Sequence, residues 1–522
     1  MAKQLARLQP RGIVADQPPH FVPPEMFTSG ENVSFRNARI QRVGGMASIW
    51  QSVNPLPEPP IHLLYSPYQG IGYWLICGAD SVTVTDGITF ADITPASPLQ
   101  NVTENFWVSG TLNGLAILNN GKDAPIYWDG NTINACQTLP DWPTNTFAYS
   151  VRPYKYHLVA LSIDGPGGLD DTFLQWSDAA APGQVPQSWT IDPSSEAGNN
   201  ILGDETGGII DGLALRDDFI IYKRHSTYIM TYVGGQIVMA FRKLFVGVGV
   251  LGRNCVAELN GFHYVLADGD VFVHDGQTVR SIADDRVRET LFTLIDANFY
   301  SNSYVVANKN ENEIYFCVPT GGLPEARNAL VYHVDSDVWG HRDIPSCPHA
   351  AEGIVATGVD PAPVVSWDSF TTFWQFANRK WNQTSQTIGT VNDGVLFAQP
   401  DGYNGRNVLF LDAATLQNGL IVDARLERLS WDMGSPGQIK IVRRIWPQFT
   451  VANGTVFNFQ VGGEINLSDP ISFQSFIYTQ GEDKSVDVLV TGRYISIIIE
   501  TEQDAVWQLT GFDIEYELRS RF

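Results

Sequence analysis

The sequence predicts an all-β protein with a β-propeller-like body and a separate, sandwich-like C-terminal part. Short β-branched runs alternate with turn dipeptides along a chain that contains 47 glycines and 30 prolines, a composition typical of many short antiparallel strands. A turn motif recurs at a spacing that suits propeller blades. Towards the C-terminus, apolar and polar residues alternate strictly over longer strands.

The predicted domain boundaries follow these changes in pattern. With 522 residues, the chain exceeds the roughly 250–300 residues at which a single core stops growing, so two or more domains are expected. We expect an N-terminal arm over residues 1–60, a propeller-like body with insertions over residues 61–424 and a C-terminal domain over residues 425–522. The hinge between arm and body is rich in proline and contains Pro55, Pro57, Pro59 and Pro60.

The clearest strands of the body lie between Phe262 and Val279. Apolar residues alternate up to a turn at Asp268-Gly269, and a second turn at Asp275-Gly276 precedes a third strand. Because Asp-Gly supplies the positive φ angles of tight hairpins, this segment is predicted to be a β-meander. A second predicted hairpin consists of Phe219–Tyr222 and Tyr228–Val233, around Lys223–Thr227.

The turns of the body contain a repeat, Asp-Gly-x-Thr followed by an apolar residue. It occurs at Asp86–Phe90, Asp129–Ile133 and Asp275–Val279. The first two copies are 43 residues apart and the third follows after 146 residues, close to three periods of about 49. A meander that recurs about every 40–50 residues is typical of propeller blades, so Leu330–Trp339 is interpreted as part of a further blade. An irregular β-sandwich assembly is the alternative.

One helix is predicted within the body, over Asp284–Phe299. Its apolar residues fall at helical spacing, and they are Val287, Leu291, Leu294, Ile295 and Phe299. Asp284 or Asp285 is expected to cap the first turn.

Strict alternation in the C-terminal domain predicts strands with one buried and one wet face, as in a sandwich. The apolar members of these strands are Val486, Val488, Val490, Ile495, Ile497, Ile499, Phe512, Ile514, Tyr516 and Leu518. Asp513, Glu515 and Glu517 occupy the opposite face of the last strand.

Charge and composition exclude several classes of protein. The 33 basic and 56 acidic residues give a net charge of −23, which disfavours tight binding to nucleic acid. Residues 1–45 nevertheless carry six basic and three acidic side chains, a net charge of +3. No apolar stretch approaches the roughly 18 residues that span a bilayer, and no secretory signal is expected at the N-terminus. Five well-separated cysteines without a Cys-x-x-Cys pair indicate reduced thiols in a cytoplasm.

Two motifs that suggest ligand chemistry have simpler structural interpretations. Gly247–Gly252 matches the dinucleotide fingerprint, yet no amphipathic helix follows it to hold a pyrophosphate, so a glycine-rich connection between blades is expected. His333, His341, Cys347 and His349 suggest zinc, but only Cys347 and His349 have the close spacing of a ligand pair. We therefore predict polar loop residues here, with no metal and no cofactor.

No catalytic residues can be named from the sequence. The Asp-Gly-x-Thr turns resemble the Asp-box of propeller sialidases, in which Asp and Gly shape a hairpin and do not catalyse. A retaining glycosidase needs two carboxylates at the scissile bond, whereas neighbouring residues on a strand point to opposite faces. The adjacent pairs Asp170-Asp171, Asp217-Asp218 and Asp284-Asp285 therefore predict no active site.

Several stretches together resemble the tail hub or nozzle proteins (tail tubular, DNA-stabilisation-like proteins) of short-tailed, podovirus-like bacteriophages. Gly30–Gly45 is similar to the opening of these proteins, after a proline-rich arm. Val246–Gly276 is similar to their central blade, and Ala505–Tyr516 is similar to their C-terminal strand. The three stretches occur in the family's order, while residues 140–215 and 345–420 match no part of it.

The resemblance implies both a fold and a role. The implied fold is a propeller-like body, with a platform that the N- and C-terminal segments form together. The implied role is that of a non-catalytic virion protein, a hexameric tail nozzle or hub below the portal and adaptor. Such a ring continues the DNA channel and retains DNA until ejection, and it is assembled in the host cytoplasm.

The resemblance also implies the partners. They are further copies of the chain, portal and adaptor proteins, tail fibre, spike or needle proteins, and double-stranded DNA that passes without sequence-specific binding. No small-molecule substrate is implied. Two alternatives remain open: a propeller-fold glycosidase or carbohydrate-binding protein, and a cytoplasmic propeller scaffold for other proteins.

The charge distribution suits a DNA channel. Lys or Arg contacts to phosphate would add affinity, so a lumen that DNA traverses is expected to be acidic. The repulsion from carboxylates reaches only about 8 Å at physiological salt, so only those that face the lumen matter. In the basic arm, Arg36, Arg39 and Arg42 are candidates for docking onto an acidic neighbour, and the alternative is a solvated strand face.

Overall fold

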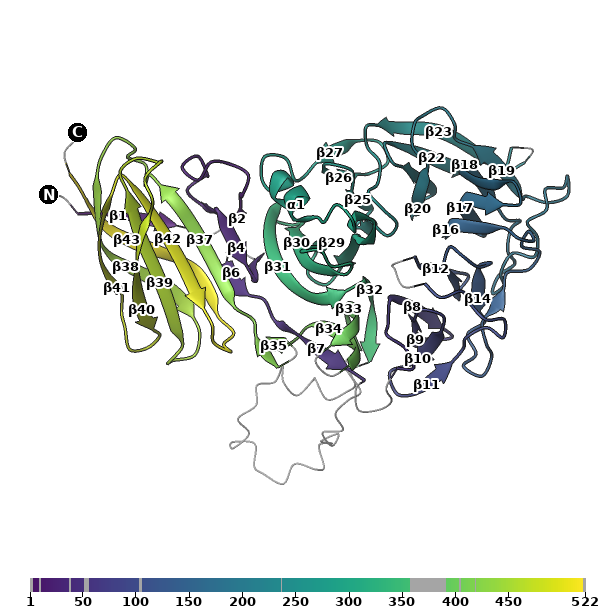
Figure 1. Cartoon of the computed structure of the whole chain (residues 1–522), viewed down its shortest axis with the longest axis horizontal. Coiled ribbons are helices and arrows are strands. Elements are labelled where there is room, and N and C mark those ends of the chain that lie inside the picture. The colour runs from purple at the N-terminus through teal and green to yellow at the C-terminus, as the bar shows by residue number, and fades with distance from the viewer. Residues whose placement is uncertain are drawn as a thin grey trace, which may run out of the picture. The chain divides into compact units, whose positions relative to one another are not determined.

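The computed structural model describes residues 3–8, 11–36, 39–50, 56–102, 106–235, 237–356, 391–402, 405–417 and 419–519. β-Strands dominate these residues, which contain a single α-helix (Figure 1). The predicted fold class is confirmed: the chain is all-β, with a propeller-like body and a sandwich-like platform.

The chain folds as two compact units. Unit 1 comprises Met1–Ala47, Cys255–Pro345 and Leu411–Phe522. Unit 2 comprises Ser48–Asn254 and Ser346–Phe410. This division differs from the predicted boundaries, because residues 255–345 fold together with both ends of the chain instead of with the rest of the body.

Unit 2 contains four consecutive sheets, each an antiparallel meander of four strands in chain order, which is the form of a propeller blade. The first two sheets consist of β8 (His62–Tyr68), β9 (Ile71–Cys77), β10 (Val82–Thr85) and β11 (Phe90–Asp92), and of β12 (Val108–Leu112), β13 (Leu115–Asn119), β14 (Ile126–Trp128) and β15 (Gln137–Thr138). The next two consist of β16 (Phe147–Tyr154), β17 (His157–Gly165), β18 (Gly168–Trp176) and β19 (Gly198–Ile201), and of β20 (Ile209–Leu215), β21 (Asp218–Lys223), β22 (Ser226–Tyr232) and β23 (Met239–Val246). The first strands lie next to one another, β8 beside β12, β12 beside β16 and β16 beside β20 (Figure 1).

A fifth four-stranded sheet has its first strand beside β8. Its strands, in order, are β32 (His349–Ala356), β33 (Val391–Gly402), β34 (Gly405–Ala414) and β7 (Gly45–Ile49). The stretch 140–215, which the resemblance leaves unmatched, forms the third sheet and begins the fourth. Much of the other unmatched stretch, and Pro55 of the hinge, lie outside the described residues.

Apolar side chains between neighbouring sheets hold unit 2 together. Between the first two sheets, Leu75 and Val84 pack in one cluster with Trp107, Leu118 and Trp128, and all five are fully buried. Removing a side chain of this size from water contributes about 2–3 kcal/mol before the entropy of ordering is subtracted. The indole of Trp107 keeps its polar atom satisfied by donating to the carbonyl of Gly78 at 3.1 Å.

All three Asp-Gly-x-Thr turns join the third and fourth strands of their sheets. Oδ1 of Asp86 accepts hydrogen bonds from the amides of Ile88 and Thr89 and from the Thr89 hydroxyl. Asp275 makes the same set with the two residues at the corresponding positions, whereas Asp129 accepts from Asn131 and Asn134. The 43 residues between the first two turns therefore correspond to an advance of one sheet, and the 146 residues between the second and third turns correspond to an advance of three sheets.

The predicted hairpins are confirmed. The meander in Phe262–Val279 forms the sheet β24 (Val256–Leu259), β25 (Phe262–Leu266), β26 (Val271–His274) and β27 (Val279–Ser281) of unit 1. β21 and β22 form the second predicted hairpin. The segment Leu330–Trp339 spans the turn between β30 (Ala326–His333) and β31 (Val338–Cys347).

Unit 1 also contains a nine-stranded sheet that joins a blade to the platform. Its order is β28 (Tyr304–Asn308), β29 (Glu313–Pro319), β30, β31, β4 (Ser29–Glu31), β37 (Ala424–Trp431), β42 (Tyr494–Thr501), β39 (Val456–Glu464) and β40 (Ser472–Thr479). Strand β4 from the N-terminal arm pairs with β31 through Glu31 and with β37. This pairing is the physical reason that residues 255–345 group with the chain ends.

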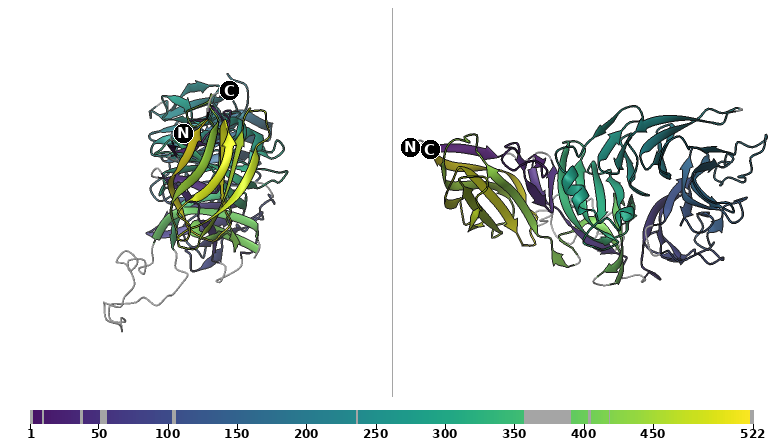
Figure 2. Two further views of the ribbon diagram at one scale, coloured as in Figure 1. Left: turned by 90° about the vertical axis from the view of Figure 1, so that its left-hand side faces the viewer. Right: turned by 45° about the horizontal axis from the view of Figure 1, so that its top comes forward.

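The second sheet of the platform is built from both ends of the chain. Its order is β41 (Val486–Gly492), β38 (Lys440–Thr450), β43 (Gln508–Leu518), β6 (Arg39–Arg42) and β5 (Val33–Arg36), and β1 (Lys3–Leu8) also pairs with β43. Figure 2 shows the purple strand β1 beside the yellow strand β43. Two short sheets complete the unit and consist of β2 (Gly12–Ile13) and β3 (Met26–Phe27), and of β35 (Leu416–Gln417) and β36 (Leu420–Ile421).

The two platform sheets enclose one apolar core, as the alternating pattern predicts, but the predicted wet face is wrong for β42, where Ser496 and Ile498 are buried as well, and for Glu515 of β43, which is also buried. Val486, Val488 and Val490 of β41 are buried in this core, and the side chains between them are exposed. Ile497 of β42 and Ile514 of β43 belong to the same core. A sandwich therefore forms from strands that lie at opposite ends of the sequence.

The single helix is shorter than predicted. α1 extends over Arg288–Leu294, and a 3₁₀ turn, η1, follows at Tyr300–Asn302. Val287 and Leu291 are the buried residues that anchor the segment.

The expected cap from Asp284 or Asp285 is wrong. Neither side chain caps the helix: Asp284 forms an ion pair with Arg288 at 3.6 Å, and Asp285 adopts a positive φ of 47°. The cap comes from Asp16 in the N-terminal arm, whose carboxylate accepts hydrogen bonds from the amides of Glu289 at 2.7 Å and Thr290 at 3.0 Å. A distant segment has therefore taken the role that proximity in sequence suggested for the local aspartates.

Candidate functional site

The three candidate docking arginines lie on the β5–β6 hairpin of unit 1, and the structure separates them. Arg39 is exposed and donates a hydrogen bond to Gln508 at 3.3 Å. The side chains of Arg36 and Arg42 are only 19 % and 1 % exposed. A solvated strand face is therefore wrong for Arg36 and Arg42, and of the three only Arg39 presents its charge to solvent. Docking itself stays a prediction.

Arg36 and Arg42 line a pocket of about 400 Å³ within unit 1. The hairpin contributes Ser34 and Gln41 as well, and other segments contribute Glu311 and Asp412. Because residues 34 and 36 share one face of β5, Ser34 and Arg36 reach the pocket while Val33 and Phe35 enter the core.

Arg36 is held by carboxylates of its own chain. Its Nε lies 2.5 Å from Oε1 of Glu313, and its Nη1 lies 3.2 Å from Glu311. Glu313 is fully buried and also contacts His333 and the hydroxyl of Tyr315, each at 2.9 Å. Burial on its own would raise the pKa of Glu313, but hydrogen bonds and charge from His333 and Arg36 outweigh it and lower the pKa to about 2.

Arg42 is held mainly by backbone carbonyls. It donates to the carbonyl oxygens of Val422 and Thr415 at 2.9 Å and of Ala505 at 3.2 Å. Burial lowers the pKa of Arg42, and the carboxylate of Asp504, 3.7 Å away, opposes that shift. The guanidinium therefore fastens the N-terminal hairpin to three segments near the C-terminal end of the chain.

A third arginine completes this arrangement. Arg342 of β31 is 1 % exposed, forms an ion pair with Asp412 at 2.8 Å and donates to the carbonyl of Gly44 at 2.7 Å. A Cβ at Gly44 would lie 2.9 Å from the Cα of Asp412, so this approach requires glycine. The two cations that line the pocket, Arg36 and Arg42, are thus already held by internal partners, an arrangement that fixes structure and does not offer their charge to a ligand.

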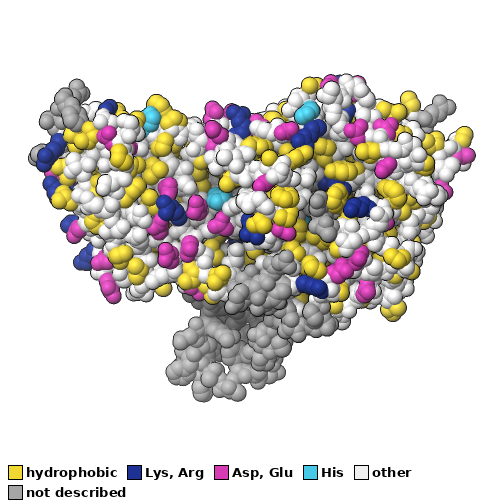
Figure 3. All heavy atoms as spheres, in the orientation of Figure 1, with side chains coloured by type: hydrophobic (Ala, Val, Ile, Leu, Met, Phe, Trp, Pro, Cys, Tyr) yellow, Lys and Arg dark blue, Asp and Glu magenta, His cyan; other side chains and the backbone are white. Residues whose placement is uncertain are grey.

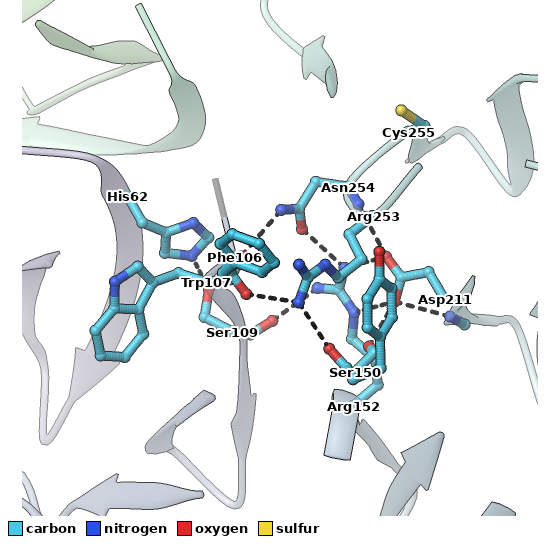
Figure 4. A network of polar contacts seen from close by, with 12 residues as sticks. His62, Phe106, Trp107, Ser109, Ser150, Arg152, Asp211, Arg253, Asn254 and Cys255 are labelled. Carbon is cyan, nitrogen blue, oxygen red and sulfur yellow. Dashed lines mark hydrogen bonds and ion pairs between the residues drawn. The ribbon is translucent and has the colours of Figure 1, made fainter. Parts of the chain in front are cut away.

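A second polar cluster lies in unit 2, where first strands of successive sheets meet (Figure 4). Arg152 of β16 forms a bidentate ion pair with Asp211 of β20, with N···O distances of 2.9 and 2.6 Å. Asp211 also accepts hydrogen bonds from Ser150 at 2.7 Å and from the amide of Asn254 at 3.0 Å. Burial would raise the pKa of Asp211, but Arg152 outweighs this effect and the pKa is lowered.

Two stacked histidines extend this cluster across further first strands. The rings of His62 on β8 and His349 on β32 lie 3.9 Å apart. Nε2 of His62 is 2.7 Å from the hydroxyl of Ser109, whose carbonyl accepts a hydrogen bond from Arg152. Burial, reinforced by Arg152, lowers the pKa of His349 to about 3. Burial also lowers the pKa of His62 far below its ordinary value, and both rings are neutral at pH 7.

The glycine-rich segment Gly247–Gly252 delivers two members of this cluster. It follows β23, and Arg253 and Asn254 come directly after it. The Arg253 guanidinium lies 3.8 Å from the centre of the Tyr149 ring and donates to the carbonyls of Tyr149 and Phe106. A Cβ at Gly249 would lie 2.2 Å from the carbonyl oxygen of Arg224, so close backbone packing explains that glycine. The segment is a connection, as predicted.

Sequence reasoning missed the cluster because its members are isolated polar residues within apolar strands. Arg152 and Asp211 are 59 residues apart, and Arg152 and Asn254 are 102 residues apart. The available signal is the position of each residue within the first strand of a repeat, which becomes visible only once the repeats are aligned.

The suspected zinc ligands lie on strands β30, β31 and β32, so the prediction of polar loop residues is wrong, and their side chains have other partners. His333 contacts Glu313, and Nε2 of His341 lies 3.2 Å from the amide of Asn328. His349 stacks on His62, and Cys347 is buried. Within the described ranges, no group of three or more His, Cys, Asp or Glu residues is placed to hold a metal ion.

The five cysteines are all buried and unbridged, in line with the expectation of reduced thiols. Burial raises the pKa of Cys136 and of Cys317 to about 12. No helix in the described part of the chain is long and apolar enough to cross a membrane.

Comparisons with known proteins do not assign a family. No protein-family model matches the chain, and no curated protein matches it. Among solved structures, it is similar to the extracellular domain of a putative one-component system from B. thetaiotaomicron, with 8 % identity and a TM-score of 0.41. That match covers 90 % of this chain and 63 % of the other, so the chain spans less than two thirds of that protein's length. A second similar structure is the AfRom2 CNH domain, with 8 % identity, a TM-score of 0.34 and coverage of 71 % and 98 %.

Proposed function

We propose that the chain is a non-catalytic virion protein that forms the hexameric tail nozzle or hub of a short-tailed bacteriophage. In this role it lies below the portal and adaptor, continues the DNA channel and retains DNA until ejection. The observation that carries the proposal is the platform: the N- and C-terminal segments fold together into one sandwich, as the sequence resemblance implies.

The continuous sheet that joins this platform to a blade supports the proposal that unit 1 resists mechanical separation of its parts. Strand β4 is hydrogen-bonded on one side to β31 and on the other to β37, so one sheet continues from a blade into the sandwich. Arg36, Arg42 and Arg342 add buried ion pairs and hydrogen bonds between the same segments. Separating these segments requires breaking the sheet and leaving buried charges unpaired, which is costly.

The charges support a channel that DNA passes without being held. The net charge of −23 opposes binding to phosphate. On the face drawn in Figure 3, the described Lys and Arg side chains are scattered among Asp and Glu side chains. Several arginines are paired internally, including Arg7 with Asp513 and Arg425 with Glu427.

The polar clusters favour a structural protein over an enzyme. Each charged group of the unit 2 cluster is hydrogen-bonded to another member of the cluster. Asp211, for example, accepts hydrogen bonds from Arg152, Ser150 and Asn254. A catalytic carboxylate needs a free lone pair or a proton within reach of substrate, whereas Asp211 is fully buried. The same cluster explains the polar residues of the first strands without any substrate.

The experiment is quantitative mass spectrometry of density-purified particles of the virus that encodes the chain. The proposal predicts that the chain is an integral component, present at one hexamer for each portal ring. Absence from intact particles would contradict it and would favour the glycosidase and scaffold alternatives, which hydrolysis of a panel of glycosides and capture of cytoplasmic partners would then separate.

A further inference from the structure

In the platform sheet that contains both chain ends, β1 and β41 each have one edge that pairs with no strand in the part of the chain that the structure describes. In the sheet that contains both chain ends, β1 is hydrogen-bonded only to β43, and β41 is hydrogen-bonded only to β38. Between them, β43 and β38 pair with each other, so the local order is β1, β43, β38, β41. Free edges of this kind are templates for pairing with another strand.

Both edge strands expose a leucine next to a charged residue on the outer face. On β1, Leu5 is 70 % exposed and the side chain of Arg7 is 64 % exposed, while Ala6 between them packs against the core. On β41, Leu489 is 61 % exposed and the side chain of Asp487 is 72 % exposed. Charged side chains usually protect sheet edges from pairing, and here each edge also displays an apolar residue beside its charge.

On the outer face, each edge strand forms an ion pair with its neighbour. The edge residue is a cation on β1 and an anion on β41. Arg7 lies 2.8 Å from Asp513 on the next strand, and Arg444 of β38 lies 2.6 Å from Asp487 on β41. One edge of the sheet is therefore terminated by a cation and the other by an anion. A second copy placed alongside would continue the alternation of charge across the boundary.

We propose that β1 of one copy pairs with β41 of the next, so that the sheet continues from subunit to subunit. This inference deepens the proposed function and rests on it, because it assigns the contact that closes the proposed ring. The contact is head-to-tail: one surface of the chain meets a different surface of the next copy, which generates a ring when the rotation closes.

The direction of the strands fits this contact. All neighbours among β1, β43, β38 and β41 are antiparallel, so β1 and β41 run in opposite directions. A rotation that preserves the strand direction from copy to copy therefore makes β41 and the next β1 antiparallel. Placing Leu5 opposite Leu489 then brings Arg7 opposite Asp487. In an antiparallel pair, the residue two positions later on one strand lies opposite the residue two positions earlier on the other.

The proposed contact has the form of β-strand addition. Main-chain hydrogen bonds along the two edges supply affinity, and the facing leucines and the Arg7–Asp487 pair fix the register. A partner other than a second copy would also need an extended strand with an exposed apolar residue and an anion. The chain itself supplies such a strand in β41, which is why a second copy is the occupant that we assign.

Site-specific cross-linking tests the contact. The double variant Leu5→Cys/Leu489→Cys is treated with a short bis-maleimide, both as the concentrated full-length chain and within virus particles that carry it. The five native cysteines are buried, so the reagent reports the introduced pair. The matched control is Leu5→Cys/Ile477→Cys, since Ile477 on the edge strand β40 of the other platform sheet is equally exposed, at 63 %.

The double variant is expected to form a ladder of covalent oligomers, with at least about tenfold more product than the control, because pairing raises the effective concentration of the two thiols to the millimolar range. Each single-cysteine variant is expected to give no product beyond background. A ladder that is equal in the control, or a dimer from Leu5→Cys alone, overturns the head-to-tail contact.

The outcome in particles separates this inference from the proposed function. If the chain is present at ring stoichiometry and the double variant forms no ladder, the contact is wrong and the function stands. If the chain is absent from particles and the concentrated chain forms the ladder, the function is wrong and the contact stands. If the chain is absent from particles and forms no ladder in solution, both are overturned.

Discussion

At the scale of single residues, buried charge that is paired within the chain dominates the structure. Arg152 and Asp211 neutralise each other where first strands of unit 2 meet. Removing one partner of such a pair leaves the other charge buried and unpaired, which typically costs about 3–5 kcal/mol. The half-buried turn residue Asp129 provides a contrast, because its hydrogen bonds are exposed and solvent compensates for their loss.

Asp211→Asn is therefore expected to lower the free energy of unfolding by about 3–5 kcal/mol. The substitution keeps the shape of the side chain, removes its charge and replaces one acceptor oxygen with an NH2 group that faces donors of the cluster. Denaturant titration of the full chain measures the loss, with Asp129→Asn as a control that is expected to change stability by less than about 1 kcal/mol. Equal stability of the two variants would show that the ion pair does not hold the strands together.

The stacked histidines predict a dependence of stability on pH. Their pKa values are lowered in the folded state, to about 3 for His349, whereas an unfolded histidine titrates near about 6.5. Below that pH the unfolded chain binds protons that the folded chain does not, so stability is full above about 6.5 and falls as the pH drops towards 3.

At pH 5, this effect is expected to cost about 2 kcal/mol for His349, and His62 adds to it in the same direction. Unfolding titrations at pH 7, 6 and 5 measure it. His349→Gln is expected to reduce the slope, because it removes one of the two stacked rings, and the same substitution at the exposed His225 is the matched control. A wild-type stability that is constant between pH 7 and 5 would contradict the account.

The docking hypothesis now concerns one arginine. Arg39→Glu is expected to leave the free energy of unfolding unchanged within about 0.5 kcal/mol, since surface substitutions rarely exceed that value, and to reduce incorporation into particles. Arg42→Glu is the structural contrast, because it places an anion among the carbonyls of Val422, Thr415 and Ala505 and is expected to prevent folding of unit 1. Normal incorporation of Arg39→Glu would remove the last exposed candidate.

At the scale of elements, contacts between segments far apart in sequence decide details that local pattern leaves open. Asp16 caps α1 although 273 residues separate it from Glu289. Loss of a side-chain cap typically costs about 1 kcal/mol.

Asp16→Ala is expected to lower the free energy of unfolding by about 1 kcal/mol and to raise amide exchange in the first turn of α1. Asp284→Ala is the control and is expected to change stability by no more than about 0.5 kcal/mol, because its ion pair with Arg288 is exposed. Thermal unfolding and hydrogen exchange at Glu289 and Thr290 measure the two effects. An equal loss of stability in both variants would contradict the assignment of the cap to Asp16.

Local pattern predicts the strands well and the pairing of distant strands poorly. The Asp-Gly turns at Asp86 and Asp275 fix hairpins through bonds within four residues, so the sequence reveals them. The alternation of Val486, Val488 and Val490 likewise depends only on one buried face. The insertion of β4 between β31 and β37, and the meeting of Arg152 with Asp211, depend on tertiary contacts that leave no local trace.

At the scale of the whole molecule, the chain is strongly acidic, both of its ends form the platform, and a blade shares a sheet with that platform. These properties suit a rigid ring through which DNA moves, because binding to phosphate would require exposed cations. In the proposed role the polar clusters serve the fold, because a channel component needs stiffness and does not need a catalytic site.

The most direct test of this account is a cryo-electron microscopy reconstruction of the tail of intact particles. We predict a ring of this fold below the portal and adaptor, with Asp and Glu side chains facing the lumen. A lumen at that position formed by another protein, or one lined by Lys and Arg side chains of this chain, would contradict the central claim.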